Sequence, residues 1–344
     1  MFKHLRWLLF PFSLLYSLVV GMRNWAYDNQ FYKRTSFSFP VVVIGNIAVG
    51  GTGKSPMTEY VLRLLQSEMN VAVLSRGYGR KTKGFREVSV QDTAALVGDE
   101  PLQIKRKFPA NRVFVCENRV QGIQQFADQV DAVLLDDAYQ HRSLQGSFYI
   151  LLIDYASLQE PIISLPAGNF REGLSGAKRA DCIVITKCPK VMPDATKFKI
   201  ESKLKAHSAA PIFYAEIAYQ PLQHKSEPAI SLDFTAKDAA ALLLTGIAKP
   251  EPLLAYLRPL FKEIKHMAFA DHHAFTKEEL QKVGQRFAQI DAEKKIIVTT
   301  EKDLQRLPDW FMQQYPIYTV PIEPAFLFDQ TAIFNNLVKG AFRR

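Results

Sequence analysis

Cysteine is scarce in this chain. Its three cysteines, Cys116, Cys182 and Cys188, are too few and too scattered for a disulfide framework or a zinc site. Such usage is typical of a protein from a reducing compartment, with thiols buried in the core. The sequence therefore gives no support to a fold held together by disulfide bonds or structural zinc.

Internal repeats, low-complexity tracts and long basic runs are also missing. The chain nevertheless carries a formal net charge of +9, which favours an anionic partner such as a nucleotide or a phospholipid surface. Because the excess charge is spread along the sequence, we do not expect nucleic acid as a partner, and nothing implies an obligate protein partner. The 344 residues are enough for about two domains with cores of their own.

No apolar run is long enough to cross a bilayer comfortably. The N-terminal run covers residues 7–20 and is interrupted by a proline and two serines. Even when it is extended to Met22, a helix of this length spans about 24 Å, whereas the hydrocarbon core of a bilayer is about 30 Å thick. Basic residues flank the run on both sides: Lys3, Arg6, Arg23, Lys33 and Arg34.

A basic flank before an apolar stretch would also suit a secretory signal peptide, but no small-x-small cleavage site follows the run. A helix that lies in the membrane interface fits the pattern better. We therefore expect residues 1–35 to form a membrane-associated helical segment. A helix that covers the apolar core of its own domain remains the alternative.

What the chain does contain is a glycine-rich loop in the setting of a phosphate-binding P-loop. A short β-branched run at residues 40–44 indicates a buried strand, and residues 56–66 favour a helix. Glycines between them let backbone amides surround phosphate oxygens, next to the positive end of the helix. The residues expected to bind a nucleotide are Ala48, Val49, Gly50, Gly51, Thr52, Gly53, Lys54 and Ser55.

Two residues of this loop would act directly on the nucleotide. Lys54 would reach the β- and γ-phosphates, and the Ser55 hydroxyl would bind Mg²⁺. Ala48 stands where the strict pattern has its first glycine, a small change for such a loop. We therefore expect ATP as the nucleotide and Mg²⁺ as the metal.

Apolar strand-like runs alternate with amphipathic stretches from residue 40 onward. This alternation predicts an α/β fold in which helices cover a parallel sheet of the P-loop NTPase type. Helices are expected at Thr58–Ser67 and Asn118–Gln129. The expected strands are Val41–Ile44, Val71–Ser75, Val113–Val115, Ala132–Leu135, Phe148–Ile153 and Cys182–Thr186.

An alternating polar and apolar stretch at residues 211–223 predicts a strand that crosses to a second, smaller α/β lobe. We expect a P-loop lobe over residues 36–210, a β hinge and linker over 211–237, and the second lobe over 238–344. In that lobe, helices are expected at Glu251–Leu260 and Thr276–Ile290. Its expected strands are Ala241–Gly246, Ile264–Phe269, Lys295–Thr299 and Ile317–Val320.

Several acids and histidines are candidates for chemistry near the loop. Asp136 and Asp137 end an apolar strand, where P-loop enzymes place an acid that holds Mg²⁺. Asp99 could be a general base for a substrate hydroxyl, although an exposed loop carboxylate is the plainer interpretation. His272 and His273 follow Asp271, and such a cluster either orients a catalytic imidazole or forms a polar turn.

The order of these motifs resembles one family, the tetraacyldisaccharide 4'-kinases, which are the lipid A 4'-kinases. The resemblance covers nearly the whole chain, including the apolar N-terminus. Small departures are Ser55 for a frequent threonine, Ala138 for a frequent glycine, and Glu172-Gly173 for a frequent Glu-Pro pair. The matching segments are 45–46 leading into 50–56, 75–80, 97–101, 136–142, 165–172, 179–181, 186–187, 271–273 and 300–303.

The resemblance implies ATP-dependent phosphorylation of the 4'-hydroxyl of a tetraacyldisaccharide 1-phosphate, which gives lipid IVA in lipid A biosynthesis. It implies a lipid A disaccharide precursor as partner and a peripheral or monotopic place at the cytoplasmic face of the bacterial inner membrane. It also implies that Asp99 is the base, assisted by His272, with His273 left as the alternative.

The chemistry of phosphoryl transfer agrees with these roles, because positioning and charge neutralisation matter most. Lys54 and Mg²⁺ would stabilise the phosphate charge, Asp99 would accept the hydroxyl proton, and His272 would orient Asp99. Candidates for contacting the anomeric phosphate of the substrate or the charge of the transition state are Arg76, Arg80, Arg142 and Arg171.

A membrane-associated P-loop switch ATPase or GTPase is the alternative function. One group of such switches has a signature lysine where this chain has Val49. A guanine reader would need an Asn/Thr-Lys-x-Asp motif, and residues 186–189 lack the aspartate. Both absences favour the kinase.

Overall fold

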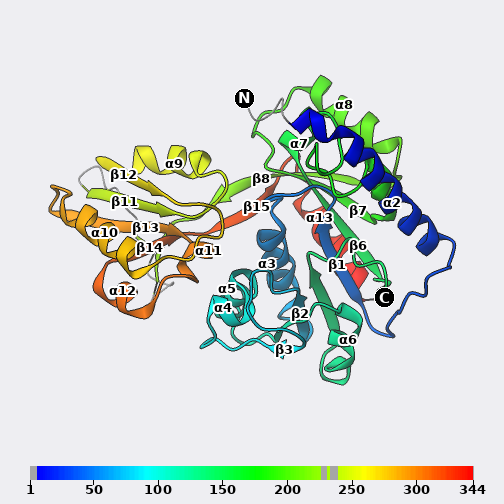
Figure 1. Ribbon diagram of the computed structural model, residues 1–344, viewed down its shortest axis with the longest axis horizontal. Helices are drawn as coiled ribbons and strands as arrows, with labels where there is room; N and C mark the ends of the chain where they lie inside the picture. Colours follow the sequence, from blue (N-terminus) through cyan, green and yellow to red (C-terminus); the bar gives the residue numbers. More distant parts are fainter. Residues whose placement is uncertain (1–5, 226–230, 233–238, 344) are drawn as a thin grey trace.

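The computed structural model describes residues 6–225, 231–232 and 239–343, and these form two lobes, each built around its own β-sheet (Figure 1). The larger lobe has a nine-stranded sheet in the order β15-β8-β7-β6-β1-β5-β2-β4-β3. The seven inner strands of this order are parallel. The edge strands β15 and β3 pair antiparallel with β8 and β4. Its strands are β1 (Val41–Asn46), β2 (Val71–Ser75), β3 (Arg86–Glu87), β4 (Val113–Val115), β5 (Ala132–Asp136), β6 (Phe148–Asp154), β7 (Cys182–Thr186), β8 (Ile212–Tyr219) and β15 (Ile322–Phe326).

Every residue of β1 is buried, because helices cover both faces of the sheet. The chain leaves β1 for β2, β3 and β4 on one side, returns to β5 beside β1, and then continues through β6 to β8 on the other side. Ligands bind where the strand order reverses in this way, at the carboxyl ends of the strands. The helical elements of the lobe are η1 (Arg6–Leu9), α2 (Phe10–Asp28), α3 (Lys54–Leu65), α4 (Ala94–Val97), α5 (Asp99–Lys107), α6 (Arg119–Gln124), η2 (Ala127–Gln129), α7 (Tyr155–Gln159), η3 (Leu174–Arg179), α8 (Asp194–Lys205) and α13 (Thr331–Phe342).

Over the described residues, the smaller lobe has a six-stranded sheet in the order β10-β9-β14-β13-β11-β12. The apolar strands β11 and β13 lie in its centre, between two separate core clusters. Its strands are β9 (Leu222–His224), β10 (Ser231–Leu232), β11 (Ala239–Thr245), β12 (Glu263–Ala268), β13 (Lys294–Thr300) and β14 (Ile317–Val320). Its helical elements are α9 (Glu251–Leu257), η4 (Arg258–Leu260), α10 (Lys277–Ala288), α11 (Glu301–Leu304) and α12 (Asp309–Gln314).

Two strand connections join the lobes (Figure 1). The expected crossing strand is present, but it divides into β8 in the larger sheet and β9 in the smaller one. The return connection from β14 to β15 runs beside it, and the amide of Gln220 donates to the carbonyl of Pro321 at 2.8 Å. Residues 226–230 and 233–238 of the linker expected over 211–237 lie outside the described residues.

The expectation that residues 238–344 form the second lobe is wrong for the last part of this range. β15 pairs with β8 in the larger sheet, and Phe334 and Val338 of α13 are buried in the core of that lobe. Pro324 lies within β15, where an edge strand tolerates it, and it hides the strand pattern in the sequence. The larger lobe is therefore closed by the C-terminal segment.

Most of the predicted strands agree with the structure, but three helices differ, and the one expected at Glu251–Leu260 is α9 followed by the turn η4. The helix expected at Thr58–Ser67 begins at Lys54, because the loop ends at Gly53. The helix expected at Asn118–Gln129 is α6 followed by the separate turn η2.

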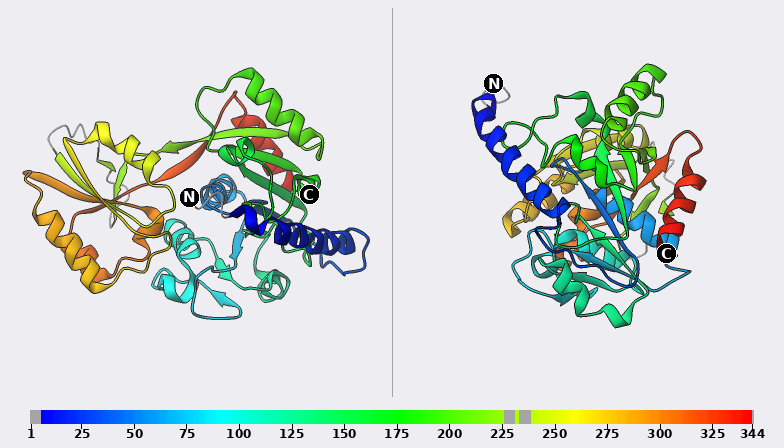
Figure 2. Two further views of the ribbon diagram at one scale, coloured as in Figure 1. Left: turned by 45° about the horizontal axis from the view of Figure 1, so that its top comes forward. Right: turned by 90° about the vertical axis from the view of Figure 1, so that its right-hand side faces the viewer.

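Helix α2 lies along the outside of the larger lobe (Figure 2). Its apolar side chains face outward: Phe12, Leu15 and Leu18 are 61%, 60% and 58% exposed. Its buried residue is the polar Ser13, and among the described residues none of α2 packs in a hydrophobic core cluster, so the alternative of a helix covering an apolar core is wrong. Among the described residues, no helix is both long and apolar enough to traverse a membrane.

The place of α13 in the core leads to a prediction about stability. Phe334 is fully buried against the rings of Phe213 and Phe326, so Phe334→Ala should lower the free energy of unfolding by about 3–5 kcal/mol. Its neighbour Ile333 is 63% exposed, and Ile333→Ala should change the free energy of unfolding by less than about 0.5 kcal/mol. Denaturant unfolding measures both, and equal losses would contradict the packing of α13.

Candidate active site

The glycine-rich loop between β1 and α3 leaves room for an anion. Gly50 and Gly53 have φ angles of 101° and 82°, in the left-handed region that favours glycine. No described heavy atom lies within 4 Å of the place that a Cβ would take at Gly50 or Gly51. In the described part of the chain no side chain caps the N-terminus of α3, so its first amides can point at phosphate oxygens.

Neighbouring residues hold this loop in place from outside. The Asn46 side-chain amide donates to the Thr52 hydroxyl at 2.7 Å, and the Thr186 hydroxyl donates to the Thr52 carbonyl at 2.9 Å. The amide of Val49 donates to the carbonyl of Asn169 at 2.7 Å. The bracing residues lie on β1, β7 and a later loop, so the tertiary fold fixes the shape of the glycine-rich loop.

The two acids after β5 have different environments. Asp136 is 1% exposed, accepts a hydrogen bond from Thr58 at 3.1 Å, and pairs in register with Ile44 of β1. Burial, together with the charges of Glu100 and Asp137, raises the pKa of Asp136 to about 7.

Asp137 is more exposed and has a φ of 49°. This backbone turn directs its carboxylate to the Nζ of Lys54 at 3.8 Å and to the guanidinium of Arg171 at 3.2 Å. The expected group of Lys54 and the two strand-end acids is thus assembled at one edge of the sheet.

The donor set at this edge fits Mg²⁺. Within the described ranges, no cluster of three or more His, Cys, Asp or Glu is placed to hold a metal alone. Mg²⁺ characteristically uses one or two carboxylates together with substrate phosphates and water, which matches Asp136, Asp137 and the Ser55 hydroxyl. A nearby cation would also stabilise the ionised form of Asp136, which burial and the charges of Glu100 and Asp137 disfavour.

A second group of side chains surrounds Asp99 at the start of α5. His272 Nδ1 lies 3.2 Å from Asp99 Oδ2, and Arg306 donates to the same oxygen. Lys302 Nζ lies 2.9 Å from His272 Nε2. His272 has a φ of 58°, and this backbone conformation turns its ring toward Asp99.

Burial would raise the pKa of Asp99, but the hydrogen bond with His272 and the charges of Lys302 and Arg306 outweigh it. The pKa of Asp99 is therefore held well below its ordinary value, and the carboxylate is ionised near neutral pH. It is 4% exposed, so the plainer interpretation of Asp99 as an exposed loop acid does not fit.

The structure separates the two adjacent histidines. His273 Nε2 lies 2.8 Å from Glu279, whose side chain also caps the first turn of α10 together with Thr276. His273 therefore contributes to the start of a helix, while His272 faces Asp99. Asp271 lies 4.0 Å from His272 Nε2 on its outer side.

Both groups meet at the boundary between the lobes. Glu100 follows Asp99, bonds to Lys302 at 3.1 Å, and its charge reaches Asp136. The charged contacts between α5 and the residues from Glu301 to Arg306 bring Asp99 and His272 together from different lobes. Sequence reasoning assigned no role to Thr58, Lys302 or Arg306, although segment 300–303 stood out as a motif.

The four candidate arginines lie in different surroundings. Arg171 is beside Asp137. Arg76 is exposed, and it lies near His141: burial lowers the pKa of that histidine, and the charges of Arg119 and Arg76 lower it further. Arg80 is buried against Glu117 at 2.6 Å, and Arg142 is buried against Asp28 of α2 at 2.5 Å. The structure thus supports a site role for Arg171, whereas Arg80 and Arg142 pair with structural carboxylates.

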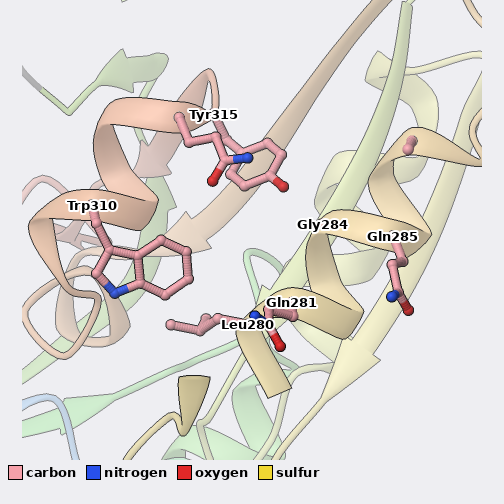
Figure 3. Close-up of a pocket in the computed structure, with 8 residues that line it drawn as sticks. Leu280, Gln281, Gly284, Gln285, Trp310 and Tyr315 are labelled. Atoms are coloured by element: carbon pink, nitrogen blue, oxygen red, sulfur yellow. The ribbon is translucent and has the colours of Figure 1, made fainter. Parts of the chain in front are cut away.

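A separate cavity of about 610 Å³ opens between α10 and α12 in the smaller lobe (Figure 3). Leu280, Gly284, Trp310 and Tyr315 line it, with four further residues of the same two segments. None of these lining residues belongs to either group described above, so the cavity is not part of the candidate site.

Comparisons with known proteins agree with this geometry. The profile of the family described as tetraacyldisaccharide-1-P 4'-kinase matches residues 5–342. A tetraacyldisaccharide 4'-kinase of Flavobacterium johnsoniae is 42% identical over 95% of this chain and 94% of its own. A tetraacyldisaccharide 4'-kinase of Phocaeicola vulgatus is 39% identical over 98% of this chain and 95% of its own.

A solved structure of LpxK from Aquifex aeolicus in complex with ATP superimposes with a TM-score of 0.78 at 27% identity, covering 98% of this chain and 99% of the other. Family profile, relatives and structure all match over nearly the full length. The chain therefore belongs to the tetraacyldisaccharide 4'-kinase family.

Proposed function

We propose that this protein transfers the γ-phosphate of ATP to the 4'-hydroxyl of a tetraacyldisaccharide 1-phosphate, giving lipid IVA in lipid A biosynthesis. The observation that carries the proposal is the ionised, buried Asp99 held by His272 at the lobe boundary, where the charge of the neighbouring Glu100 reaches the strand-end acid Asp136. A kinase needs both a phosphate-binding loop and an acceptor for the hydroxyl proton. Family membership over the full chain supports the same activity.

In this mechanism Lys54 and the amides of the loop bind the phosphates and neutralise their charge. Mg²⁺, held by Ser55, Asp136 and Asp137, would supply further charge neutralisation at the phosphates. Asp99 accepts the proton of the sugar hydroxyl, and His272 fixes the direction of its carboxylate. Arg171, already beside Asp137, is placed to meet substrate or transition-state charge.

A switch ATPase or GTPase is not favoured, because phosphoryl transfer to a hydroxyl needs a proton acceptor, and Asp99 with His272 from the other lobe provides one. The relatives are named as kinases, and the chain matches them over more than nine-tenths of their length. The aspartate of a guanine-reading motif is also missing at residues 186–189.

We further propose that α2 holds the protein at the cytoplasmic face of the inner membrane, where an acylated acceptor would lie. The support is the outward apolar face of the helix, with Trp25 exposed in addition to the residues named above, and Trp7 and Leu8 exposed in the preceding turn η1. An apolar helix face against the headgroup region is the usual arrangement of a monotopic anchor. Exposed aromatic and basic residues near its ends, such as Trp25 and Lys33, suit the interface.

The role of the loop lysine can be tested directly. Lys54→Ala should lower turnover by roughly a hundredfold or more, because its charge faces the phosphates. Thermal unfolding should change little, since its ion-pair distance to Asp137 is 3.8 Å. Lys190→Ala, at an 81% exposed side chain, is the control and should keep normal turnover. Full turnover of Lys54→Ala at saturating ATP would refute the assignment.

The two histidines give a matched pair of variants. Asp99→Asn should lower kcat about 10²–10⁴-fold, and His272→Ala should also lower kcat without adding fully to Asp99→Asn. His273→Ala should leave kcat near normal, because His273 bonds to Glu279 instead. Steady-state kinetics measures kcat for each single variant and for the Asp99→Asn, His272→Ala double variant, and the losses are compared. Fully multiplicative losses, or equal losses at both histidines, would contradict the pairing.

The membrane role of α2 can be separated from folding. A variant with serine at Phe12, Leu15 and Leu18 should sediment less with vesicles that contain phosphatidylglycerol, since these side chains already face outward. Its thermal unfolding should match that of the parent protein. Phe198→Ser, at a 74% exposed residue of α8, is the control for lost surface hydrophobicity. Unchanged sedimentation of the triple variant would rule out this face as the anchor.

A further inference from the structure

Residues 163–172 lie between α2 and the glycine-rich loop, and side chains of the N-terminal helical segment bond to their backbone. The guanidinium of Arg6 donates to the carbonyl of Gly168 at 2.8 Å. The Ser13 hydroxyl accepts the amide of Ala167 at 2.9 Å, and the Tyr16 hydroxyl donates to the carbonyl of Arg171 at 3.0 Å. The polar inward face of α2 is thus used to hold this segment.

The opposite side of the same segment contacts the loop. The carbonyl of Asn169 accepts the amide of Val49, and the amide of Arg171 donates to the carbonyl of Ile47, both at 2.7 Å. Phe170 forms an isolated β-bridge with Ala48. Three successive residues of the segment, 169–171, therefore fix the backbone at the start of the loop.

Arg171 links the helix to the phosphate site through its side chain as well. Its carbonyl is held by Tyr16, while its guanidinium lies 3.2 Å from Asp137, the acid that faces Lys54. A parallel link runs through Glu172, which accepts from Asn24 of α2 at 3.1 Å and from Gln140 at 3.1 Å.

The segment has little freedom to absorb a shift. A Cβ at Gly168 would overlap the carbonyl oxygen of Ile163, so the backbone is folded closely on itself. Phe170 is 2% exposed, and Glu172 is buried against Arg179. A displacement of α2 would therefore move the residues that hold the loop, because close-packed groups transmit strain.

We propose that Ser13 and Tyr16 of α2 are positioning residues for the nucleotide. They hold segment 163–172 so that Asn169 fixes Val49 and Arg171 meets Asp137, and α2 thereby sets the affinity of the loop for ATP. This inference rests on the proposed binding of ATP at the glycine-rich loop. It assigns α2 a second role besides contact with a lipid surface, since the two roles use opposite faces of the helix.

The test compares two tyrosines of the same helix. Tyr16→Phe removes only the hydroxyl that bonds to Arg171, whereas Tyr27→Phe removes a hydroxyl at the other end, where the Tyr27 ring contacts Tyr32 and Arg142. Ser13→Ala is a second, independent perturbation of the segment. ATP binding is measured by titration calorimetry on the full-length protein in detergent, without acceptor or vesicles, alongside thermal unfolding.

We expect Tyr16→Phe to weaken ATP binding about threefold to tenfold, with unchanged thermal unfolding, because one partly buried hydrogen bond is lost. Ser13→Ala should weaken it similarly, and Tyr27→Phe should bind ATP as the parent protein does. Unchanged ATP binding in both Tyr16→Phe and Ser13→Ala would overturn the proposal. So would equal weakening by Tyr16→Phe and Tyr27→Phe, which would indicate a general effect on the helix.

Steady-state kinetics gives a second readout. Tyr16→Phe should raise KM for ATP with little change in kcat, because it acts on the loop rather than on Asp99. Failure of the unaltered protein to bind ATP would instead overturn the proposed function, and this inference with it. A lowered kcat at unchanged KM for ATP would contradict a positioning role for the nucleotide.

Discussion

The charged contacts between α5 and the segment from Glu301 to Arg306 are the constraint on which the site depends. Asp99 and Glu100 belong to the larger lobe, and Lys302 and Arg306 to the smaller one. Lys107 continues the contact by lying 2.6 Å from Glu59 and 2.7 Å from Glu301. Buried charges of this kind are costly unless they are paired, so the lobes must meet in register for the buried Asp99 carboxylate to have its partners.

The same contacts explain why the site has two chemically different halves. On one side, backbone amides, Lys54 and the acids after β5 form a place for phosphates and a cation. On the other, His272 and two basic residues hold a carboxylate in its ionised form. The two chain crossings between the lobes lie side by side, because β8 and β15 pair antiparallel and Gln220 donates to the carbonyl of Pro321 just beyond them.

Helix α2 reverses the usual relation between a surface helix and its domain. Its apolar side chains point away from the larger lobe, and its polar side chains bond to the backbone of segment 163–172. An apolar inward face would bind by area alone, whereas hydrogen bonds to defined carbonyls and amides fix one position of the helix. The Asp28 carboxylate, between Arg142 and Lys178, holds its other end.

Short-range patterns in the sequence determined the strands, the glycine-rich loop, the acids after β5 and the apolar N-terminal run. These features depend on residue type and spacing over a few positions, which is what a sequence displays. Only the tertiary structure decided that β15 and α13 close the larger lobe, that His272 rather than His273 meets Asp99, and that Arg80 and Arg142 pair with structural acids. Each of these depends on contacts between residues far apart in the chain, where a left-handed backbone at His272 or a strand pairing at Pro324 leaves no periodic signal.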